Sequence, residues 1–258
     1  MDYEPILKTA FQAAHEAGDV LRSYHGHLTG IRKKAANDLV TEADVASEEV
    51  IIEAIRTDFP GHGILAEESG EMVMDSPFSW IIDPLDGTTN YAHGLSTYAV
   101  SIAVAHKGET VVGVVFNPDS GEMFSAVKNG GAMLNALSIA VSVEPLVSES
   151  LLVTGFPYDF KAHIMPLITR FQQCLSAARA VRRFGSAAID LCYVACGRFD
   201  GFWEQNLNPW DTAAGELIVR EAGGMVTDFS NRPFQMQMKE ILATNGKIHQ
   251  QMQSLLSL

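Results

Sequence analysis

Apolar residues recur at helical spacing in two stretches near the start of the chain. The first stretch, residues 6–21, places them every three or four positions and predicts an amphipathic helix. The second follows Thr41, where Thr41 and Asp44 have the form of a capping box, and its apolar stripe continues to Ile55. The Phe-Pro-Gly sequence at 59–61 predicts the end of this second helix.

Runs rich in β-branched residues follow the two helices. Residues 98–105 and 111–116 flank Lys107 and Gly108, which predicts a hairpin. Residues 122–127 come after a Pro-Asp-Ser-Gly turn and predict a third strand. This part of the chain is therefore expected to place helices over an antiparallel sheet.

The rest of the chain alternates between the two kinds of pattern. Strand-like runs at 151–154, 201–203 and 225–228 are separated by helical ones, which is typical of an α/β arrangement. We expect an N-terminal α+β half at 1–145 with most of the candidate site and a smaller C-terminal α/β half at 146–258. No flexible linker separates them, so they are expected to form one catalytic unit.

The strongest chemical signal is the run Asp-Pro-Leu-Asp-Gly-Thr-Thr-Asn at 83–90, which follows an apolar stretch at 80–82. That stretch predicts a buried strand, so Asp83 is expected where a strand ends, and Pro84 and Gly87 favour a turn. Several carboxylates on a rigid turn match the hard oxygen ligands that Mg²⁺ requires. The same residue types are common in ordinary turns, so a tight loop without a metal remains the alternative.

Two further segments carry acids at comparable places. The apolar run 64–66 ends at Glu67, and the Asn-Pro-Trp-Asp sequence at 208–211 opens a run of helical spacing that stops at a Gly-Gly pair. Asp211 is well placed to be the N-cap of that helix, which is the alternative to a functional role.

Taken together, these motifs resemble the inositol monophosphatase family of lithium-sensitive, magnesium-dependent phosphatases. Five separated motifs stand in the family's order, at 38–41, 67–69, 83–90, 185–188 and 210–224. The resemblance extends from about residue 5 to the C-terminus. It implies a layered α-β-α-β-α sandwich of the inositol monophosphatase and fructose-1,6-bisphosphatase type.

The resemblance implies two or three Mg²⁺ ions. The first ion would be bound by Glu67, Asp83 and the backbone carbonyl of Leu85, and the second by Asp83, Asp86 and Asp211. A third, weaker ion would lie near Glu67. Two metal ions roughly 3.5–4 Å apart can hold both the attacking and the leaving oxygen of an in-line displacement.

It also implies how water and phosphate are held. Thr88, hydrogen-bonded to Asp38, would orient the attacking water and help to take its proton, with Glu67 as the third catalytic residue. The phosphate is expected on the N–H groups of Gly87 and Thr88, where the turn enters a helix.

The hydroxyl groups of the substrate would meet a set of polar groups on both halves: Asp86, Ala187 through its backbone, Glu204 and Asp211. Glu204 would matter most for substrate choice, and a surface acid is the alternative interpretation of that residue. Adjacent arginines at 182–183 could meet a phosphate, but a solvated or subunit-contact position is the simpler expectation, and the family favours a subunit contact.

The expected activity is hydrolysis of inositol 1-phosphate by direct attack of a metal-activated water. Family members also act on fructose 1,6-bisphosphate, histidinol phosphate, 3′-phosphoadenosine phosphates or NADP, so these substrates stay open. Some bacterial relatives bind the transcription machinery, which leaves open a function of another class. A haloacid-dehalogenase-type phosphatase is disfavoured, because its Asp-x-Asp motif is replaced here by Asp-x-x-Asp.

Composition narrows the setting. The 258-residue chain has a formal charge of −13, which argues against direct binding of nucleic acid but not against a protein partner. Its three cysteines and the lack of a long apolar run predict a cytoplasmic protein without a membrane span, in which Cys192 and Cys196 are core residues. The resemblance makes a homodimer the default expectation.

Overall fold

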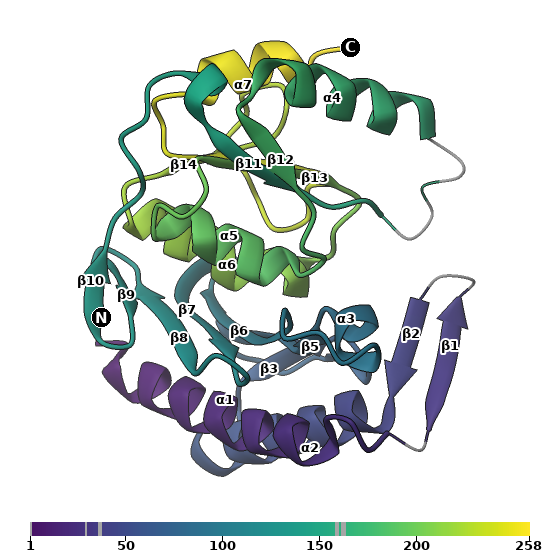
Figure 1. The fold of residues 1–258 in the computed structure, drawn as a ribbon. Coiled ribbons are helices and arrows are strands. Elements are labelled where there is room, and N and C mark those ends of the chain that lie inside the picture. Colours follow the sequence, from purple (N-terminus) through teal and green to yellow (C-terminus); the bar gives the residue numbers. More distant parts are fainter. Residues whose placement is uncertain (1, 29, 36–37, 158–159, 161–163) are drawn as a thin grey trace.

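The computed structural model describes residues 2–28, 30–35, 38–157, 160 and 164–258. Figure 1 shows helices and sheets stacked in alternating layers: α1 and α2, an eight-stranded sheet, α5 and α6, a five-stranded sheet, and finally α4 and α7. The layered α-β-α-β-α sandwich expected from the sequence is confirmed.

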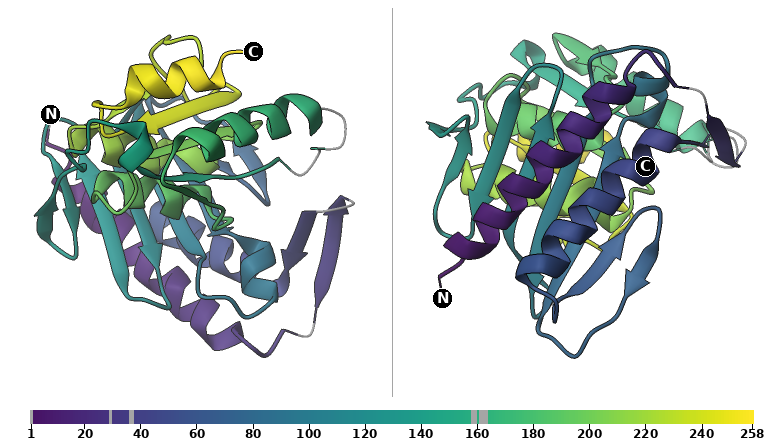
Figure 2. Two further views of the ribbon diagram at one scale, coloured as in Figure 1. Left: turned by 45° about the horizontal axis from the view of Figure 1, so that its top comes forward. Right: turned by 90° about the horizontal axis from the view of Figure 1, so that it is seen from below.

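Helices α1 (Glu4–Tyr24) and α2 (Glu42–Asp58) form the first layer and lie side by side across one face of the eight-stranded sheet (Figure 2). Both helices were predicted. The capping box of α2 is also present, because the Thr41 amide donates to Asp44 Oδ2 at 2.8 Å and the Ala43 amide donates to Thr41 Oγ1 at 3.2 Å. Helix α2 ends at Asp58 with Phe59 as its C-cap, as the Phe-Pro-Gly sequence predicts.

The eight-stranded sheet forms the second layer. Its strands are, in spatial order, β10 (Leu137–Ile139), β9 (Ala132–Leu134), β8 (Glu122–Val127), β7 (Glu109–Asn117), β6 (Ala99–His106), β5 (Phe78–Asp86), β3 (Gly63–Ala66) and β4 (Gly70–Met72). The three predicted strands and the hairpin at Lys107 and Gly108 are confirmed. The predicted strands are antiparallel, as expected, but the sheet also contains one parallel pair, β3 with β5, that the sequence did not predict.

Three short elements lie beside this sheet. Strands β1 (Ile31–Ala35) and β2 (Asp38–Thr41) form a separate antiparallel pair, and helix α3 (Thr88–Ala92) follows β5 directly. The sequence patterns did not predict the β1–β2 pair.

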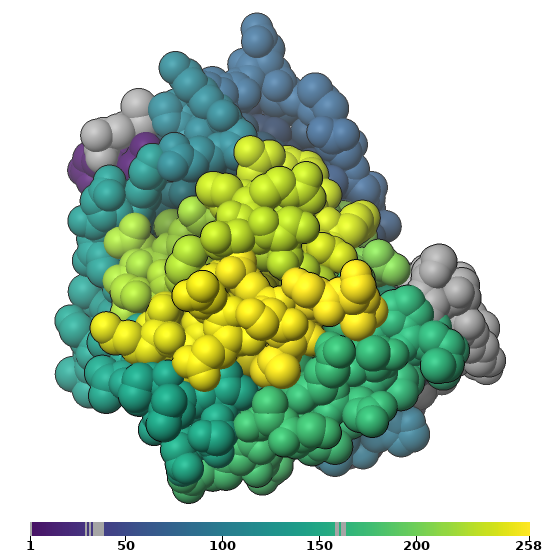
Figure 3. All heavy atoms as spheres, turned by 90° about the horizontal axis from the view of Figure 1, so that it is seen from above, coloured from purple at the N-terminus to yellow at the C-terminus, as the bar shows by residue number. Residues whose placement is uncertain are grey.

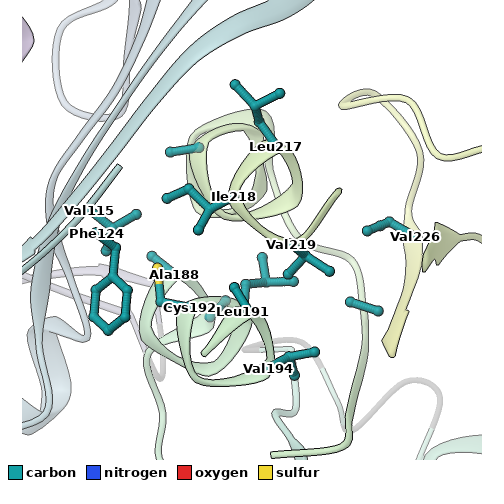
Figure 4. Close-up of a cluster of buried hydrophobic side chains, with 14 of the residues drawn as sticks. Val115, Phe124, Ala188, Leu191, Cys192, Val194, Leu217, Ile218, Val219 and Val226 are labelled. Carbon is teal, nitrogen blue, oxygen red and sulfur yellow. The ribbon is translucent and has the colours of Figure 1, made fainter. Parts of the chain in front are cut away.

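Helices α5 (Ala187–Ala195) and α6 (Pro209–Glu221) form the middle layer and pack on both sheets. In Figure 4 their apolar side chains lie between Val115 and Phe124 of the eight-stranded sheet and Val226 of the five-stranded one. The two helices approach closely at Gly215, where a Cβ atom would lie 2.7 Å from the Leu191 side chain.

The five-stranded sheet is mixed. Its order is β12 (Ala180–Arg182), β11 (Leu151–Thr154), β13 (Gly201–Gln205), β15 (Glu240–Thr244) and β14 (Met225–Thr227), with β12, β11 and β13 parallel. A short 3₁₀ helix, η1 (Val147–Glu149), precedes β11. Helices α4 (Ile164–Ala177) and α7 (His249–Leu256) cover the outer face, where they lie against each other (Figure 3).

Cys192 is fully buried in the core around α5 and α6, and Cys196 is partly buried against the same core. Among the described residues, none of the helices has the length and apolar character that crossing a membrane requires. Helices α5 and α6 contribute to one core with both sheets. The division into halves at 1–145 and 146–258 that form one catalytic unit stays a prediction.

Candidate active site

A pocket of about 520 Å³ brings together residues from both halves of the chain. One part of its wall is acidic, and another is apolar. The acidic and polar part includes Glu67, Asp83, Asp86, Thr88, Arg183, Glu204 and Asp211.

Asp83 lies within β5, one of the most buried strands, and is itself only 1% exposed. The sequence predicted that the strand ends at Asp83, but β5 continues to Asp86. Its pairing with β6 becomes irregular between Asp83 and Asp86. The Leu85 amide donates to Asp83 Oδ1 at 3.0 Å, so the carboxylate fixes the bulged backbone that follows it. The strand can therefore present two acids and a backbone carbonyl to one side of the pocket.

Gly87 ends this bulged segment with a left-handed backbone (φ 92°) and is the N-cap of α3. A Cβ atom at this position would lie 2.9 Å from the Thr97 carbonyl oxygen, so both the conformation and the space require glycine. Gly87 and Thr88 both line the pocket.

Asp86 connects the turn to the middle layer. Its Oδ2 atom accepts hydrogen bonds from Ser186 Oγ at 2.6 Å and from the Ala188 amide at 2.7 Å, at the start of α5. Ala187, between these two donors, lines the pocket. The motif at 185–188 therefore holds one of the candidate metal ligands in place.

Glu67 and Asp211 reach the same pocket from other elements. Glu67 follows β3 directly, and its amide donates to the Ile82 carbonyl of the parallel strand β5 at 3.2 Å. Asp211 is not the N-cap of α6: Asn208 is the N-cap, and Asp211 occupies the third helical position, where its Oδ2 accepts from the Asn208 amide at 2.6 Å. Asp211 therefore completes the capping box of α6 and also lines the pocket.

Thr88 is paired with Asp44. Its Oγ1 atom lies 3.1 Å from Asp44 Oδ1 and 3.0 Å from the Leu85 carbonyl oxygen. The resemblance assigned Asp38 to this partnership, but Asp38 is described only as the first backbone residue of β2, and its side chain lies outside the described part. The described partner of Thr88 is Asp44, which the sequence identified only as a capping residue.

Glu204 lies on β13 and is 8% exposed. Its carboxylate occupies the space in which a side chain at Gly155 would stand, because a Cβ atom at Gly155 would overlap it. Gly155 does not have a left-handed backbone, so the glycine is explained by the room that Glu204 takes and not by conformation.

The carboxylates of the pocket raise one another's pKa, because two negative charges close together repel. Burial and then the charges of Glu67, Asp86 and Asp211 raise the pKa of Asp83 well above its ordinary value. Burial and the charge of Asp86 likewise raise the pKa of Asp211. Burial also raises the pKa of Asp86 to about 6, although hydrogen bonds from Ser186 and Ala188 act in the opposite direction. A cation placed among these groups would offset both the repulsion and the burial cost.

This donor set fits Mg²⁺, which prefers carboxylate, carbonyl and water oxygens. Glu67, Asp83, the Leu85 carbonyl, Asp86 and Asp211 all belong to residues that line one pocket. In the described part of the chain, no three His, Cys, Asp or Glu side chains are already gathered around a single point.

Two charged residues near the pocket gained no site role from the sequence. The sequence favours a solvated or subunit-contact position for Arg183, but this residue lines the pocket, and its charge acts against the raised pKa of Glu204. Asp190 on α5 is 1% exposed, and both its carboxylate oxygens are buried without a hydrogen-bond partner in the described structure. An acid inside the otherwise apolar run of α5 was the signal that could have identified it.

Comparisons with known proteins give a consistent result. The sequence profile of the Inositol monophosphatase family matches residues 2–257. An inositol-1-monophosphatase from Synechocystis sp. is 47% identical over 258 residues, covering 99% of this chain and 90% of that protein. The Nus factor SuhB of Escherichia coli K12 is 43% identical over 247 residues, covering 95% of this chain and 92% of that protein. The solved structure of an inositol monophosphatase from Anabaena superimposes with a TM-score of 0.91 at 42% identity, covering 99% of this chain and 96% of that one.

Proposed function

The chain belongs to the inositol monophosphatase family of phosphatases, and from that premise we propose that it is a Mg²⁺-dependent phosphomonoesterase acting on inositol 1-phosphate. The products would be inositol and phosphate, formed by direct attack of water. The observation that carries the proposal is the set of four acids, Glu67, Asp83, Asp86 and Asp211, that three separate segments bring to one pocket. Bound Mg²⁺ would lower the pKa of a water molecule and stabilise the charge that develops on phosphate and leaving group.

Thr88 and Asp44 would handle the proton of the attacking water. When the Thr88 hydroxyl donates to Asp44 Oδ1, its free lone pairs can accept a hydrogen bond from water. Burial raises the pKa of Asp44 to about 6, which suits a group that takes up a proton near neutral pH. Thr88 would therefore orient the water, and Asp44 would accept the proton through the Thr88 hydroxyl.

The substrate would be held from both halves of the chain. The amides of Gly87 and Thr88 would bind the phosphate, because the left-handed backbone at Gly87 turns this segment toward the pocket. Asp86, Ala187, Glu204 and Asp211 would meet the hydroxyl groups of the inositol ring. The Glu204 carboxylate lies directly beside Gly155, where a side chain at position 155 would overlap it.

Phosphate release by metal-stripped protein, with and without added Mg²⁺, tests the proposal. The substrates are inositol 1-phosphate, fructose 1,6-bisphosphate, histidinol phosphate, 3′-phosphoadenosine 5′-phosphate and NADP. We expect Mg²⁺-dependent activity with a preference for inositol 1-phosphate, and Glu204→Ala should weaken that preference more than it lowers activity on the others. A preference for another of these compounds would support the metal-dependent site but refute inositol 1-phosphate as the main substrate.

The relatives named as Nus factors support a second candidate, a protein partner in transcription. Affinity capture of transcription complexes with purified protein tests it, and an Asp83→Asn variant should capture as well as the original chain if catalysis is not involved. Recovery of no RNA polymerase subunit or antitermination factor would count against this role. Lithium sensitivity, a homodimer and a cytoplasmic location stay predictions.

A further inference from the structure

One part of the pocket wall is apolar and offers inositol phosphate almost no polar group to bind. It comprises Phe156, Ile164, Leu167, Ile168, Leu207 and Trp210, which we call the apolar wall. Apart from the indole N–H of Trp210, these side chains offer no hydrogen-bond donor or acceptor.

The wall belongs to the folded framework and is not a set of loose surface side chains. Ile164, Leu167 and Ile168 stand three and four positions apart on α4 and so share one face of that helix. Phe156 packs edge-on against Phe171 of the same helix, with ring centroids 5.8 Å apart. Phe171 in turn packs on the core beneath α4 and α7.

Two residues of this face remain partly open to solvent: Ile164 is 42% exposed and Ile168 is 45% exposed. They line the same pocket as Asp83 and Asp86, so a molecule whose phosphate is held at the acidic turn is the natural occupant of the remaining space. Leu207 and Trp210, which lie at the β13–α6 connection and the start of α6, contribute to the same lining. The apolar surface is thus part of the pocket that holds the reacting group, unlike a patch on the outer face that a second copy could cover alone.

A polyol would fill this space poorly. Its hydroxyl groups would lose water against hydrocarbon and gain no partner, which is unfavourable for binding. An alkyl or aryl group in the same position would bury its own apolar surface and that of the wall.

Resting on the proposed phosphatase activity, we propose that the apolar wall selects phosphate monoesters whose alcohol carries an apolar group. Such an alcohol would extend from the phosphate at Gly87 and Thr88 toward α4. Inositol 1-phosphate would then use only the polar part of the pocket, and the chain would accept a second class of substrate.

Hydrolysis of a series of n-alkyl phosphates, from propyl to hexyl, tests this with Mg²⁺ present. The acidity of the leaving alcohol is nearly constant along the series, so differences in kcat/KM report binding of the chain. We expect kcat/KM to rise by roughly fourfold per methylene until the wall is filled. In Ile168→Asn the increase per methylene should fall toward onefold, whereas activity on inositol 1-phosphate should change little.

Leu175→Asn is the matched control. Leu175 is 50% exposed two helical turns beyond Ile168 on the same face of α4, outside the described pocket lining. Its substitution should leave the chain-length dependence unchanged. A flat series in the original chain, or a series equally steep in Ile168→Asn, would overturn the proposal.

Binding of the unreactive n-alkylphosphonates by calorimetry, from propyl to hexyl, separates this proposal from the proposed function. If no monoester is hydrolysed but phosphonate affinity rises with chain length and Ile168→Asn removes the rise, the phosphatase assignment fails and the apolar wall stands. If affinity does not depend on chain length and Ile168→Asn instead changes the oligomeric state, the wall is a contact between copies and the proposal is wrong.

Discussion

The pocket has an acidic region around β5 and an apolar region around α4. We assign the catalytic step to the acidic region and the selection of substrates to the apolar one. Around the bulged end of β5, acids are buried and fixed by short hydrogen bonds to backbone and side chains, as at Asp83 and Asp86. Around α4 the wall is hydrocarbon, and Phe156 in it packs against Phe171. Directional hydrogen bonds fix a reacting geometry, whereas packing against hydrocarbon accepts many shapes of similar polarity.

Glu204 lies between these two regions. It is an acid, yet it comes from β13 of the five-stranded sheet, and its carboxylate fills the space beside Gly155. We therefore expect substitutions near β5 to abolish turnover and substitutions near β13 and α4 to change which substrates are preferred.

Asp83→Asn should produce the largest effect. It removes a shared candidate ligand, so kcat should fall more than about a thousandfold, the loss expected when several kcal/mol of metal-derived stabilisation disappear. The melting temperature should be unchanged or higher, because a buried carboxylate under repulsion is neutralised. Asp75→Asn, on the exposed turn before β5, is the control and should keep full activity. Near-normal turnover in Asp83→Asn would refute the acidic region as the site of chemistry.

Asp44→Asn should lower kcat by roughly a hundredfold, the lower end of the range for loss of a general base. Its effect on KM should be small, because Asp44 acts through Thr88 and does not face the substrate. Asp38→Asn is the informative comparison, because the family resemblance assigned the role to that residue. A large loss in Asp38→Asn together with a small one in Asp44→Asn would restore the original assignment.

The candidate ligand residues could be identified from the sequence because they lie in short, contiguous motifs, and the structure places them around one pocket; that they bind a metal stays a prediction. The run at 83–90 carries its own turn chemistry in Pro84 and Gly87, and strand periodicity places it beside the core. The layered fold followed from the family resemblance, with periodicity supporting helices α1 and α2 and the hairpin between β6 and β7.

What the sequence missed depends on contacts between distant residues. The pairing of Thr88 with Asp44 joins residues 44 positions apart, and no local pattern distinguishes Asp44 in that role from Asp44 as a cap. The fit of Glu204 against Gly155 joins β13 to the residue that follows β11, 49 positions earlier in the chain, and nothing in the residues around Gly155 indicates why a glycine stands there. The parallel pairing of β3 with β5 was missed for the same reason.

The acidic region should also control how stability depends on pH in metal-free protein. Burial raises the pKa of Asp44 from 3.8 to about 6, so the folded chain binds more protons than the unfolded one across that interval. The free energy of unfolding should therefore fall as pH rises, by roughly 1–2 kcal/mol between about pH 5 and pH 8 from Asp44 alone. The raised pKa values of Asp83 and Asp211 act in the same direction.

Urea unfolding of metal-stripped protein across this range measures the effect. Asp44→Asn should flatten the dependence, and Mg²⁺ should stabilise the protein more at pH 8 than at pH 5, because it binds the ionised carboxylates. Metal-free stability that increases between pH 5 and pH 8 would contradict this account of the acidic region.

Among the substitutions near the pocket, Gly155→Ala should produce the smallest effect on activity and the most selective one. The backbone at Gly155 tolerates alanine, but the added methyl group would displace the Glu204 carboxylate at a cost of about 1–3 kcal/mol in stability. We expect kcat/KM for inositol 1-phosphate to fall about tenfold, the equivalent of one misplaced hydrogen bond to a charged group, with little change for hexyl phosphate. Gly61→Ala, where an added Cβ atom meets nothing within 4 Å, is the matched control. In a Glu204→Ala background the Gly155→Ala change should have no further effect on selectivity, because the two residues act through one contact; an additive loss would show that Gly155 serves the pocket in some way other than by positioning Glu204.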